Sequence, residues 1–327
     1  MERTPHITIG MPVYNGERYV GRAIESILAQ TMGDFELIVS DNASEDATVD
    51  ICMGYARRDA RVRVRRRSVN AGAAANFNDL VKQARGSSFK WAAHDDVLAP
   101  GYLEVTSAAL AAAPDAVAAH SRVAFIDAAD DVVRHDPFPL ERVDEPHPSR
   151  RFADAITTPH WSFWAFALCR VEALRRTDLI GPYASSDRVL IAHLALLGRF
   201  VESPEVLFFS RDHPERALRS IPEPLRRRRW LRAVGPLPAA AWYDPARAGS
   251  IAMPQWNLWR RYAALPGRCS LAPAERLRCY ASLLAWPGRQ RNAAKLARDL
   301  LLAAEHIARR DRRGDASVPD RREPRAS

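Results

Sequence analysis

The chain of 327 residues carries a net charge of +9, and 47% of its residues are hydrophobic, which is enough to bury one large core. The longest apolar runs, at 161–169 and 189–197, are too short to span a bilayer. We expect no secretory signal, because the chain reaches an apolar strand by Ile7 without a basic head and a long apolar stretch. The four cysteines are scattered without metal-site spacing, which fits a reducing compartment and predicts a cytoplasmic protein.

Strand and helix patterns alternate from residue 6 to residue 93. Residues 6–13 alternate apolar and polar side chains as a strand does, and 17–30 carry one apolar helical face. The run Leu37-Ile38-Val39 is typical of a strand that is covered on both sides. Such alternation implies right-handed crossovers and a parallel sheet, and therefore an α/β fold. Further segments continue it as helix, strand, helix and strand, at 49–56, 61–67, 77–84 and 89–93.

In such a sheet, ligands bind beyond the carboxyl ends of the strands. Three polar segments follow the predicted strands, at 14–16, 40–44 and 94–96, and two of them contain carboxylates. Asp95 and Asp96 repel each other unless a cation or strong donors compensate, which favours a metal that bridges phosphates. The alternative is a solvated or helix-capping turn. An acidic and hydroxyl cluster at 41–46 has a similar alternative, as the N-cap of the next helix.

Taken together, the motifs resemble the family 2 glycosyltransferases with the GT-A fold. They are Pro-Val-Tyr-Asn at 12–15, Asp-Asn-Ala-Ser-Glu-Asp at 41–46, Asn-Ala-Gly at 70–72 and Asp-Asp at 95–96. The resemblance implies a mixed, mostly parallel sheet between helices, followed by a mainly helical C-terminal extension. It also implies inverting transfer of a sugar from a nucleotide-diphosphate sugar, with a UDP-sugar as the expected donor. The acceptor would be a hydroxyl of a glycan or lipid-linked molecule in bacterial cell-surface glycan, glycolipid or secondary-metabolite synthesis.

The resemblance also gives individual residues a role. It puts Tyr14 beside the base and Asp41 on a base N–H group. It puts Asp95 and Asp96 at the ribose, the diphosphate and a divalent metal, Mn²⁺ or Mg²⁺, although Ala93 replaces a further Asp that many members carry. The predicted nucleotide-sugar-binding residues are Pro12, Tyr14, Asn15, Asp41, Ser44, Asn70, Asp95, Asp96 and Arg211, and the predicted metal ligands are Asp95, Asp96 and His213.

Further along the chain, Asp187 occupies the place of the family's catalytic base, while Ser186 replaces the commoner Glu. Either residue also suits the N-cap of the apolar helix that follows, and both roles can hold at once. His213 lies where family members often carry a His that contacts metal or diphosphate, and Arg211 suits a phosphate. Four aromatic residues lie where the family's acceptor subsite commonly falls, with core packing as the alternative: Trp161, Phe163, Trp164 and Phe166.

Two other functions compete with this interpretation. A nucleotidyltransferase would need a basic, glycine-rich phosphate loop after the first strand, and 12–16 contains no Lys or Arg. A nucleotide-sugar-binding or membrane-associated scaffold without catalysis is the second alternative. It is motivated by Ala93 and Ser186, which stand where the family commonly has acids.

The charge divides the chain near residue 218. Residues 219–310 hold 18 Lys and Arg against 5 Asp and Glu, together with five of the eight tryptophans. We therefore expect a GT-A domain at 1–218, a basic, mainly helical extension at 219–310 and a disordered tail at 311–327. The arginines at 226–229 beside Trp230 favour a peripheral contact with an anionic membrane, with a solvated helical face as the alternative. No nucleic-acid-binding motif accompanies this charge, so no nucleic acid partner is expected.

Overall fold

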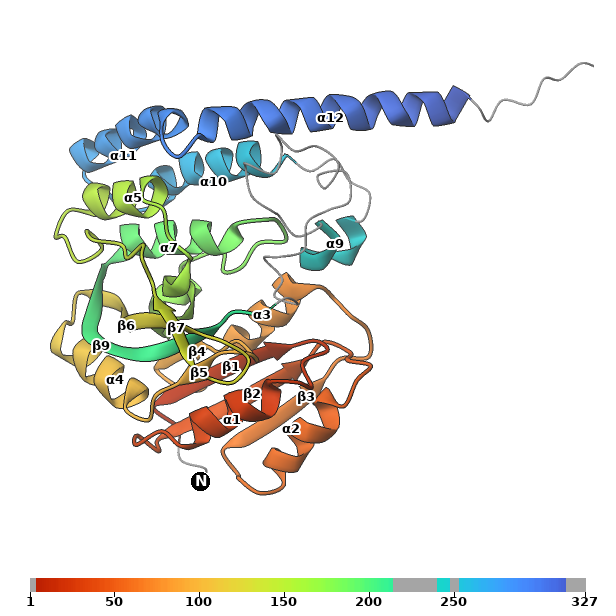
Figure 1. Ribbon diagram of the computed structural model, residues 1–327. Coiled ribbons are helices and arrows are strands. Elements are labelled where there is room, and N and C mark those ends of the chain that lie inside the picture. Colours follow the sequence, from red (N-terminus) through yellow and green to blue (C-terminus); the bar gives the residue numbers. More distant parts are fainter. Residues whose placement is uncertain (1–3, 214–239, 248–252, 316–327) are drawn as a thin grey trace, which may run out of the picture.

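The computed structural model describes residues 4–213, 240–247 and 253–315, without the side chains of Ala240, Arg247 and residues 306–315. Its centre is one mixed sheet in the order β3-β2-β1-β4-β8-β6-β9-β5, and β7 pairs with β6 outside this path (Figure 1). The strands are β1 (Ile7–Val13), β2 (Phe35–Asp41), β3 (Val62–Arg66), β4 (Ser88–Trp91), β5 (Val97–Leu98), β6 (Ala116–Ile126), β7 (Val132–His135), β8 (Leu168–Arg170) and β9 (Arg199–Arg211).

Helices cover both faces of this sheet and form a separate layer at one end of the molecule (Figure 1). The α-helices are α1 (Val20–Leu28), α2 (Thr48–Ala56), α3 (Ala73–Lys82), α4 (Tyr102–Ala112), α5 (Pro148–Thr157), α6 (Val171–Arg175), α7 (Ser186–Leu197), α9 (Ala240–Tyr243), α10 (Pro254–Arg268), α11 (Pro273–Ala285) and α12 (Asn292–Asp315). The 3₁₀ helices are η1 (Phe163–Phe166), η4 (Pro245–Arg247) and η5 (Trp286–Gly288).

The first four strands run parallel, as the sequence predicts. β1 pairs with β2 and β4, and β2 pairs with β3, all in the same direction. The helices α1, α2 and α3 make the crossovers between them, each within a few residues of its predicted range. Beyond β4 the sheet becomes mixed, because β8 pairs antiparallel with both β4 and β6, while β6 and β9 pair parallel. The predicted α/β class with a mostly parallel sheet is therefore confirmed.

The core consists of two apolar layers, one on each face of the sheet. Leu37 and Val39 of β2 belong to the layer that also contains residues of α1, α2 and α4. Ile38, which points the other way, belongs to the layer with residues of α3, α5 and α7. All three side chains are fully buried, so the predicted two-sided burial of this run is confirmed.

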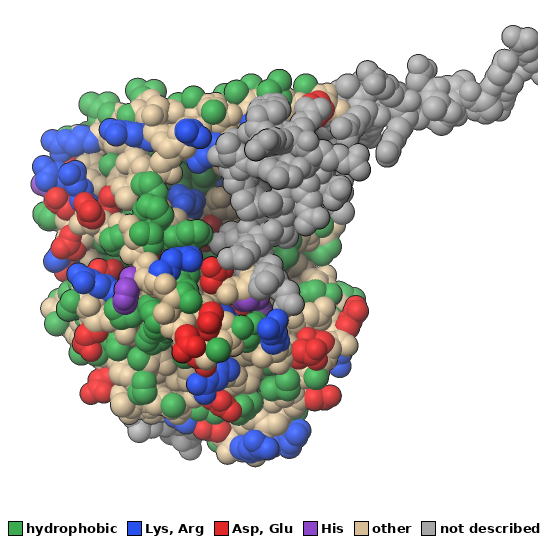
Figure 2. Space-filling view, viewed as in Figure 1, with side chains coloured by type: hydrophobic (Ala, Val, Ile, Leu, Met, Phe, Trp, Pro, Cys, Tyr) green, Lys and Arg blue, Asp and Glu red, His purple; other side chains and the backbone are tan. Residues whose placement is uncertain are grey.

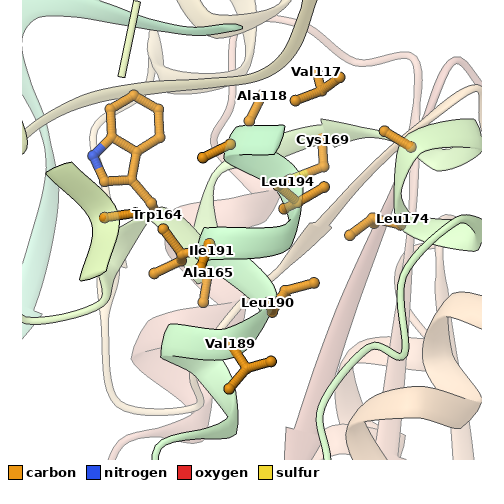
Figure 3. Packing of buried hydrophobic residues seen from close by; sticks show 14 of the residues in the cluster. Val117, Ala118, Trp164, Ala165, Cys169, Leu174, Val189, Leu190, Ile191 and Leu194 are labelled. Carbon is orange, nitrogen blue, oxygen red and sulfur yellow. The ribbon is translucent and has the colours of Figure 1, made fainter. Parts of the chain in front are cut away.

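The helix α7 is buried almost all round. Val189, Leu190, Ile191 and Leu194 lie in the core together with Trp164 and Ala165 of η1, as Figure 3 shows. A helix packed on all sides is held in position along its length. The first turn of α7, which contains Asp187, is therefore a fixed part of the structure.

The extension shares a core with the preceding domain. The helix α10 packs against α7, and α11 packs against α5. Tyr262 of α10 and Trp286 of η5 are buried in the same cluster as Phe152 of α5. The helix α12 continues to Asp315, into the stretch 311–327 that we expected to be disordered, and the rest of that stretch lies outside the described residues. Among the described residues, no helix combines the length and hydropathy of a membrane span.

Candidate active site

The loops after β1 and β2 are joined at the carboxyl edge of the sheet. The backbone N–H of Asn15 donates to Ser44 Oγ at 2.9 Å, and the side-chain oxygen of Asn15 accepts from the N–H of Glu45 at 3.0 Å. Asn15 has a φ of 50°, in the left-handed region that Asn tolerates better than most residues. Tyr14 remains 41% exposed beside this junction. Asn15 and Ser44 therefore shape the two loops, while the Tyr14 ring is accessible to a ligand.

Asp41 ends β2 as a fully buried carboxylate. Both of its oxygens accept from the backbone N–H of Ser44, at 3.3 and 3.2 Å, and Arg66 Nε lies 3.7 Å away. Asp46 accepts from the N–H of Thr48 at 3.0 Å, but the N-cap residue of α2 is Ala47 and no side-chain hydrogen bond caps this helix. Asp41 instead supports the turn between β2 and α2 from inside.

The predicted residues Pro12 and Asn70 lie on either side of this turn. Pro12 is buried in β1 opposite Ser40 of β2. The side-chain oxygen of Asn70 accepts from Asn42 Nδ2 at 2.8 Å and from the N–H of Gly72 at 2.9 Å. Asn42 was not among the predicted site residues, although it adjoins Asp41 in the predicted motif. Its amide joins the loops after β2 and β3.

Asp95 and Asp96 lie between β4 and β5 and bind the end of β9. Asp95 Oδ2 lies 2.9 Å from His213 Nε2, and Asp96 Oδ1 accepts from the backbone N–H of Arg211 at 2.9 Å. Four of the predicted residues therefore meet here, although more than 110 positions separate the acidic pair from Arg211. A turn that only faces solvent or caps a helix would not need these contacts between the acidic pair and the end of β9.

The guanidinium of Arg211 points into the protein and is 1% exposed. Its Nε donates to the Asp95 carbonyl at 2.9 Å, one terminal N–H group donates to the Asp127 carbonyl at 2.6 Å, and the other binds the carboxylate of Asp130. These contacts favour a positioning role for Arg211, which holds the backbone under the acidic pair. Its contact with phosphate remains a prediction. Nothing local in the sequence identifies Asp127 and Asp130, because their partner is about 80 residues away.

The residues around Asp95 fit a metal that a substrate helps to hold. Asp95 and His213 provide carboxylate and imidazole ligands, and His213 Nδ1 is buried without a hydrogen-bond partner. Within the described ranges, no group of three or more His, Cys, Asp or Glu side chains is placed to hold a metal by itself. Mg²⁺ and similar ions commonly take one or two protein carboxylates and complete their shell with phosphate oxygens and water. The donor set suits a metal that binds together with a diphosphate.

Asp187 lies in the first turn of α7, and Ser185 precedes this helix with a φ of 65°. No side-chain hydrogen bond caps the N-terminus of α7, and Asp187 lies in its first turn, where an acid interacts favourably with the helix dipole. The charge of Asp187 adds to the effect of burial in raising the pKa of Tyr243, a residue of α9. The carbonyl of Tyr243 also lies against Gly72, only 2.5 Å from where a Cβ on that glycine would be. The extension therefore approaches both the loop between β3 and α3 and the first turn of α7, which the sequence did not predict.

A pocket of about 470 Å³ opens between β6, β7 and the segment before η1. Trp161 is 40% exposed at this pocket, whereas Phe163 and Trp164 line it with rings that are largely buried. Phe166 does not line it and packs on Phe208. The exposed ring of Trp161 therefore fits the acceptor alternative, and the other three rings fit the core alternative.

Polar groups accompany these rings in the pocket. Burial raises the pKa of Asp136 and that of Glu202, and the charge of Asp136 raises the latter further. Burial lowers the pKa of His160 to about 3, and its carbonyl accepts from Arg188, the residue after Asp187. Neither carboxyl stands out in the sequence, since β7 and the middle of β9 were not predicted in detail. The combination of an exposed indole with carboxyl groups suits a polyhydroxy ligand.

Solved structures with this fold include TarS of S. aureus. TarS 1–349 in complex with UDP matches 87% of this chain and 72% of its own length, with a TM-score of 0.59 at 16% identity. TarS 1–349 in complex with UDP-GlcNAc matches 90% and 79%, again with a TM-score of 0.59, at 14% identity. The architecture is therefore that of the GT-A glycosyltransferases, as the sequence predicts.

Residues 8–177, just over half of the chain, match the family described as glycosyl transferase family 2. The chain belongs to this family. An uncharacterised glycosyltransferase of Rickettsia prowazekii is 36% identical over 101 residues, which are 31% of this chain and 30% of that protein. The uncharacterised glycosyltransferase EpsJ of Bacillus subtilis is 36% identical over 92 residues, 28% of this chain and 26% of that protein. The matched segment thus spans less than a third of these relatives.

Proposed function

We propose that the chain transfers a sugar from a nucleotide-diphosphate sugar to an acceptor hydroxyl, with inversion at the anomeric carbon. The observation that carries this proposal is the meeting of Asp95, Asp96 and His213 at the edge where Asp41 also lies. Family 2 membership makes a glycosyl donor the ligand to expect there. UDP-sugars are the first donors to test, since the matching TarS structures contain UDP and UDP-GlcNAc.

In this proposal the nucleoside binds against the loops after β1 and β2. The exposed ring of Tyr14 stacks on the base, and Asp41 accepts from a base N–H group. The Asp41 carboxylate is fully buried under the N–H of Ser44, so this contact requires the loop after β2 to move when the donor binds. The other predicted donor residues shape these loops or support the acidic pair: Pro12, Asn15, Ser44, Asn70 and Arg211.

Asp95, Asp96 and His213 would hold Mn²⁺ or Mg²⁺ together with the diphosphate. When bound, such an ion neutralises charge on the leaving nucleoside diphosphate. Asp96 Oδ1 already accepts from the backbone of Arg211, and the buried Arg211 guanidinium keeps the two acids in place. This support is a contribution of the chain's own residues to catalysis.

The carboxylate of Asp187 acts as the general base of the proposed reaction. It takes the proton of the acceptor hydroxyl while that oxygen attacks the anomeric carbon. The bond from this carbon to the diphosphate oxygen breaks, and its electron pair leaves with the nucleoside diphosphate. Because the attack is opposite to the leaving group, the configuration inverts. The packed helix α7 fixes the position of this carboxylate.

The pocket beside Trp161 is proposed to bind the acceptor, a glycan or a lipid-linked molecule. A sugar ring would stack on Trp161, and Asp136 and Glu202 would bind its hydroxyl groups. The hydrogen bond from Arg188 to the His160 carbonyl joins this pocket to the helical turn that contains Asp187. The setting would be bacterial cell-surface glycan, glycolipid or secondary-metabolite synthesis at the cytoplasmic face of a membrane.

The two parts of the chain divide the work in this proposal. Residues 1–218 bind the donor and provide the base, and 219–310 complete the site through Tyr243 and carry the membrane contact. The predicted arginine cluster at 226–229 and the predicted tail beyond 315 lie outside the described residues.

The test is a panel of nucleotide sugars, each with and without Mn²⁺ or Mg²⁺. Thermal stabilisation identifies the donor, because binding to the native state raises its apparent stability. Nucleotide release and NMR of the product then measure turnover and anomeric configuration. Donor binding with no turnover in the presence of any acceptor would favour the non-catalytic scaffold that Ala93 and Ser186 suggest. A retained configuration would refute inversion.

A further inference from the structure

The outward side of α11 is apolar where a surface helix is normally polar. Leu277 is 71% exposed and Leu284 is 79% exposed, among the highest values for large apolar residues in the described chain. Their spacing puts them on one side of the helix. Alanines at exposed positions extend the same stripe: Ala274, Ala281 and Ala285.

The helix α12 repeats this arrangement. Leu300 and Leu301 are 51% and 52% exposed, and exposed alanines precede and follow them at helical spacing. Both helices lie at the end of the molecule farthest from α1 and α2 (Figure 1), and Figure 2 shows apolar atoms along this edge. We call Leu277, Leu284, Leu300 and Leu301, with the exposed alanines of the two helices, the apolar face. Such a patch on a protein surface marks an interaction site.

The basic and acidic side chains near the apolar face differ in their exposure to solvent. Arg278, Arg289 and Arg291 are exposed beside it. Asp299 is fully buried, where it accepts from the backbone N–H of Gln255. The side chain of Glu275 is 12% exposed and accepts from the N–H of Ser149 at 2.9 Å. Over 273–304, both acids are therefore largely buried, whereas these three arginines are exposed, and Arg278 also pairs with Glu275 at 2.6 Å.

We propose that the apolar face lies flat on an anionic lipid bilayer, with the leucines in the interfacial region and Arg278, Arg289 and Arg291 on lipid phosphates. An amphipathic surface with basic residues at its margin binds anionic membranes in this way. Trp256, an exposed indole on the neighbouring helix α10, is suited to the same interface.

Charge favours a bilayer over a second copy of the chain. The whole chain has a net charge of +9, and 219–310 carry 18 basic against 5 acidic residues. Two copies joined through the apolar face would bring these basic segments together, whereas anionic lipid neutralises them. This proposal goes beyond the proposed transferase activity and does not depend on it. The leucines of the apolar face and the three arginines beside it all belong to the described part of the chain.

Vesicle sedimentation of the full chain tests the proposal. Vesicles of phosphatidylcholine alone are compared with equimolar phosphatidylcholine and phosphatidylglycerol. We expect binding to the second kind, weakened at least about tenfold in the double variant Leu277→Gln/Leu284→Gln. Arg289→Gln/Arg291→Gln should weaken it about tenfold as well. The control variant Val132→Gln/Val133→Gln changes two valines of β7 that are also more than half exposed, and it should bind as the unchanged protein does.

Three results would overturn the proposal. The first two are absence of binding to phosphatidylglycerol vesicles and equal binding by the leucine variant. The third is a dimer without lipid, by light scattering, that the leucine variant converts to monomer, because the face would then join two copies. Donor hydrolysis without vesicles should be the same in all variants, so a failed membrane contact is distinguishable from a failed transferase assignment.

Discussion

Lys90 is a fully buried lysine in β4, and its burial predicts how the stability of the protein depends on pH. Its Nζ lies 4.5 Å from the ring centre of Tyr102 and 4.8 Å from that of Phe208, and it donates to the Phe166 carbonyl. Burial lowers the pKa of Lys90 to about 7, against the opposing charge of Asp96. The sheet therefore contains an amine that loses its proton close to neutral pH.

The replacement Lys90→Met keeps most of the side-chain length and removes the ionisable group. Between pH 7 and 10.5 the unfolded chain binds a proton that the folded chain does not, so the stability of the unchanged protein rises with pH there. The fall of the pKa from 10.5 to about 7 corresponds to about 5 kcal/mol of folding free energy near neutral pH. The lost hydrogen bonds offset about 1–2 kcal/mol. We expect Lys90→Met to be more stable by roughly 3 kcal/mol near pH 7.

Urea unfolding followed by tryptophan fluorescence near pH 7 and near pH 10 measures this difference. The advantage of the variant should shrink as pH rises and reverse near pH 10, where little of the ionisation term is left and the lost hydrogen bonds still count against the variant. Lys82→Met, at an exposed lysine of α3, should change stability by less than about 0.5 kcal/mol at either pH. A variant that is no more stable near neutral pH, or an advantage that does not change with pH, would refute the reasoning.

Three other predictions concern the site and its surroundings. Asp95→Ala should abolish most metal-dependent transfer with the fold retained by circular dichroism, and near-normal transfer would contradict its role. Gly72→Ala should lower the free energy of unfolding in urea by about 1–3 kcal/mol, because φ is +82° and the new Cβ meets the Tyr243 carbonyl. An unchanged free energy of unfolding would contradict this close contact. Burial lowers the pKa of His120 and of His160 to about 3, so the unfolded chain gains protons first below pH 6.5. The melting temperature should fall between about pH 7 and pH 5, and a constant value would count against neutral burial of both rings.

The sequence predicts the first, parallel strands of the sheet because the signals there are local. Alternation in β1 and the apolar run in β2 locate both strands, and the polar residues that follow each of them lie at its end. Asp41, Asp95 and Asp96 are found in this way, since position in a parallel sheet and position in the chain coincide.

The sequence does not predict the contacts between segments that are far apart in the chain. The buried guanidinium of Arg211 depends on Asp127 and Asp130, which form a turn that no periodicity identifies. Periodicity also locates an apolar face without saying what covers it. Leu277 and Leu284 lie on α11, inside the extension predicted to be mainly helical, and the structure leaves both of them exposed. The approach of Tyr243 to Gly72 joins segments about 170 residues apart and has no local signal.

Asp187 is the proposed base that deprotonates the acceptor in glycosyl transfer, and kcat of the variant Asp187→Asn measures its contribution. A general base contributes about 10²–10⁴-fold to rate, so kcat should fall by that factor while donor affinity and melting temperature stay unchanged. Asp50→Asn, at an exposed acid in the first turn of α2, is the matched control and should keep full activity. An unchanged kcat in Asp187→Asn, or a variant that unfolds, would show that Asp187 is structural and that the base lies elsewhere.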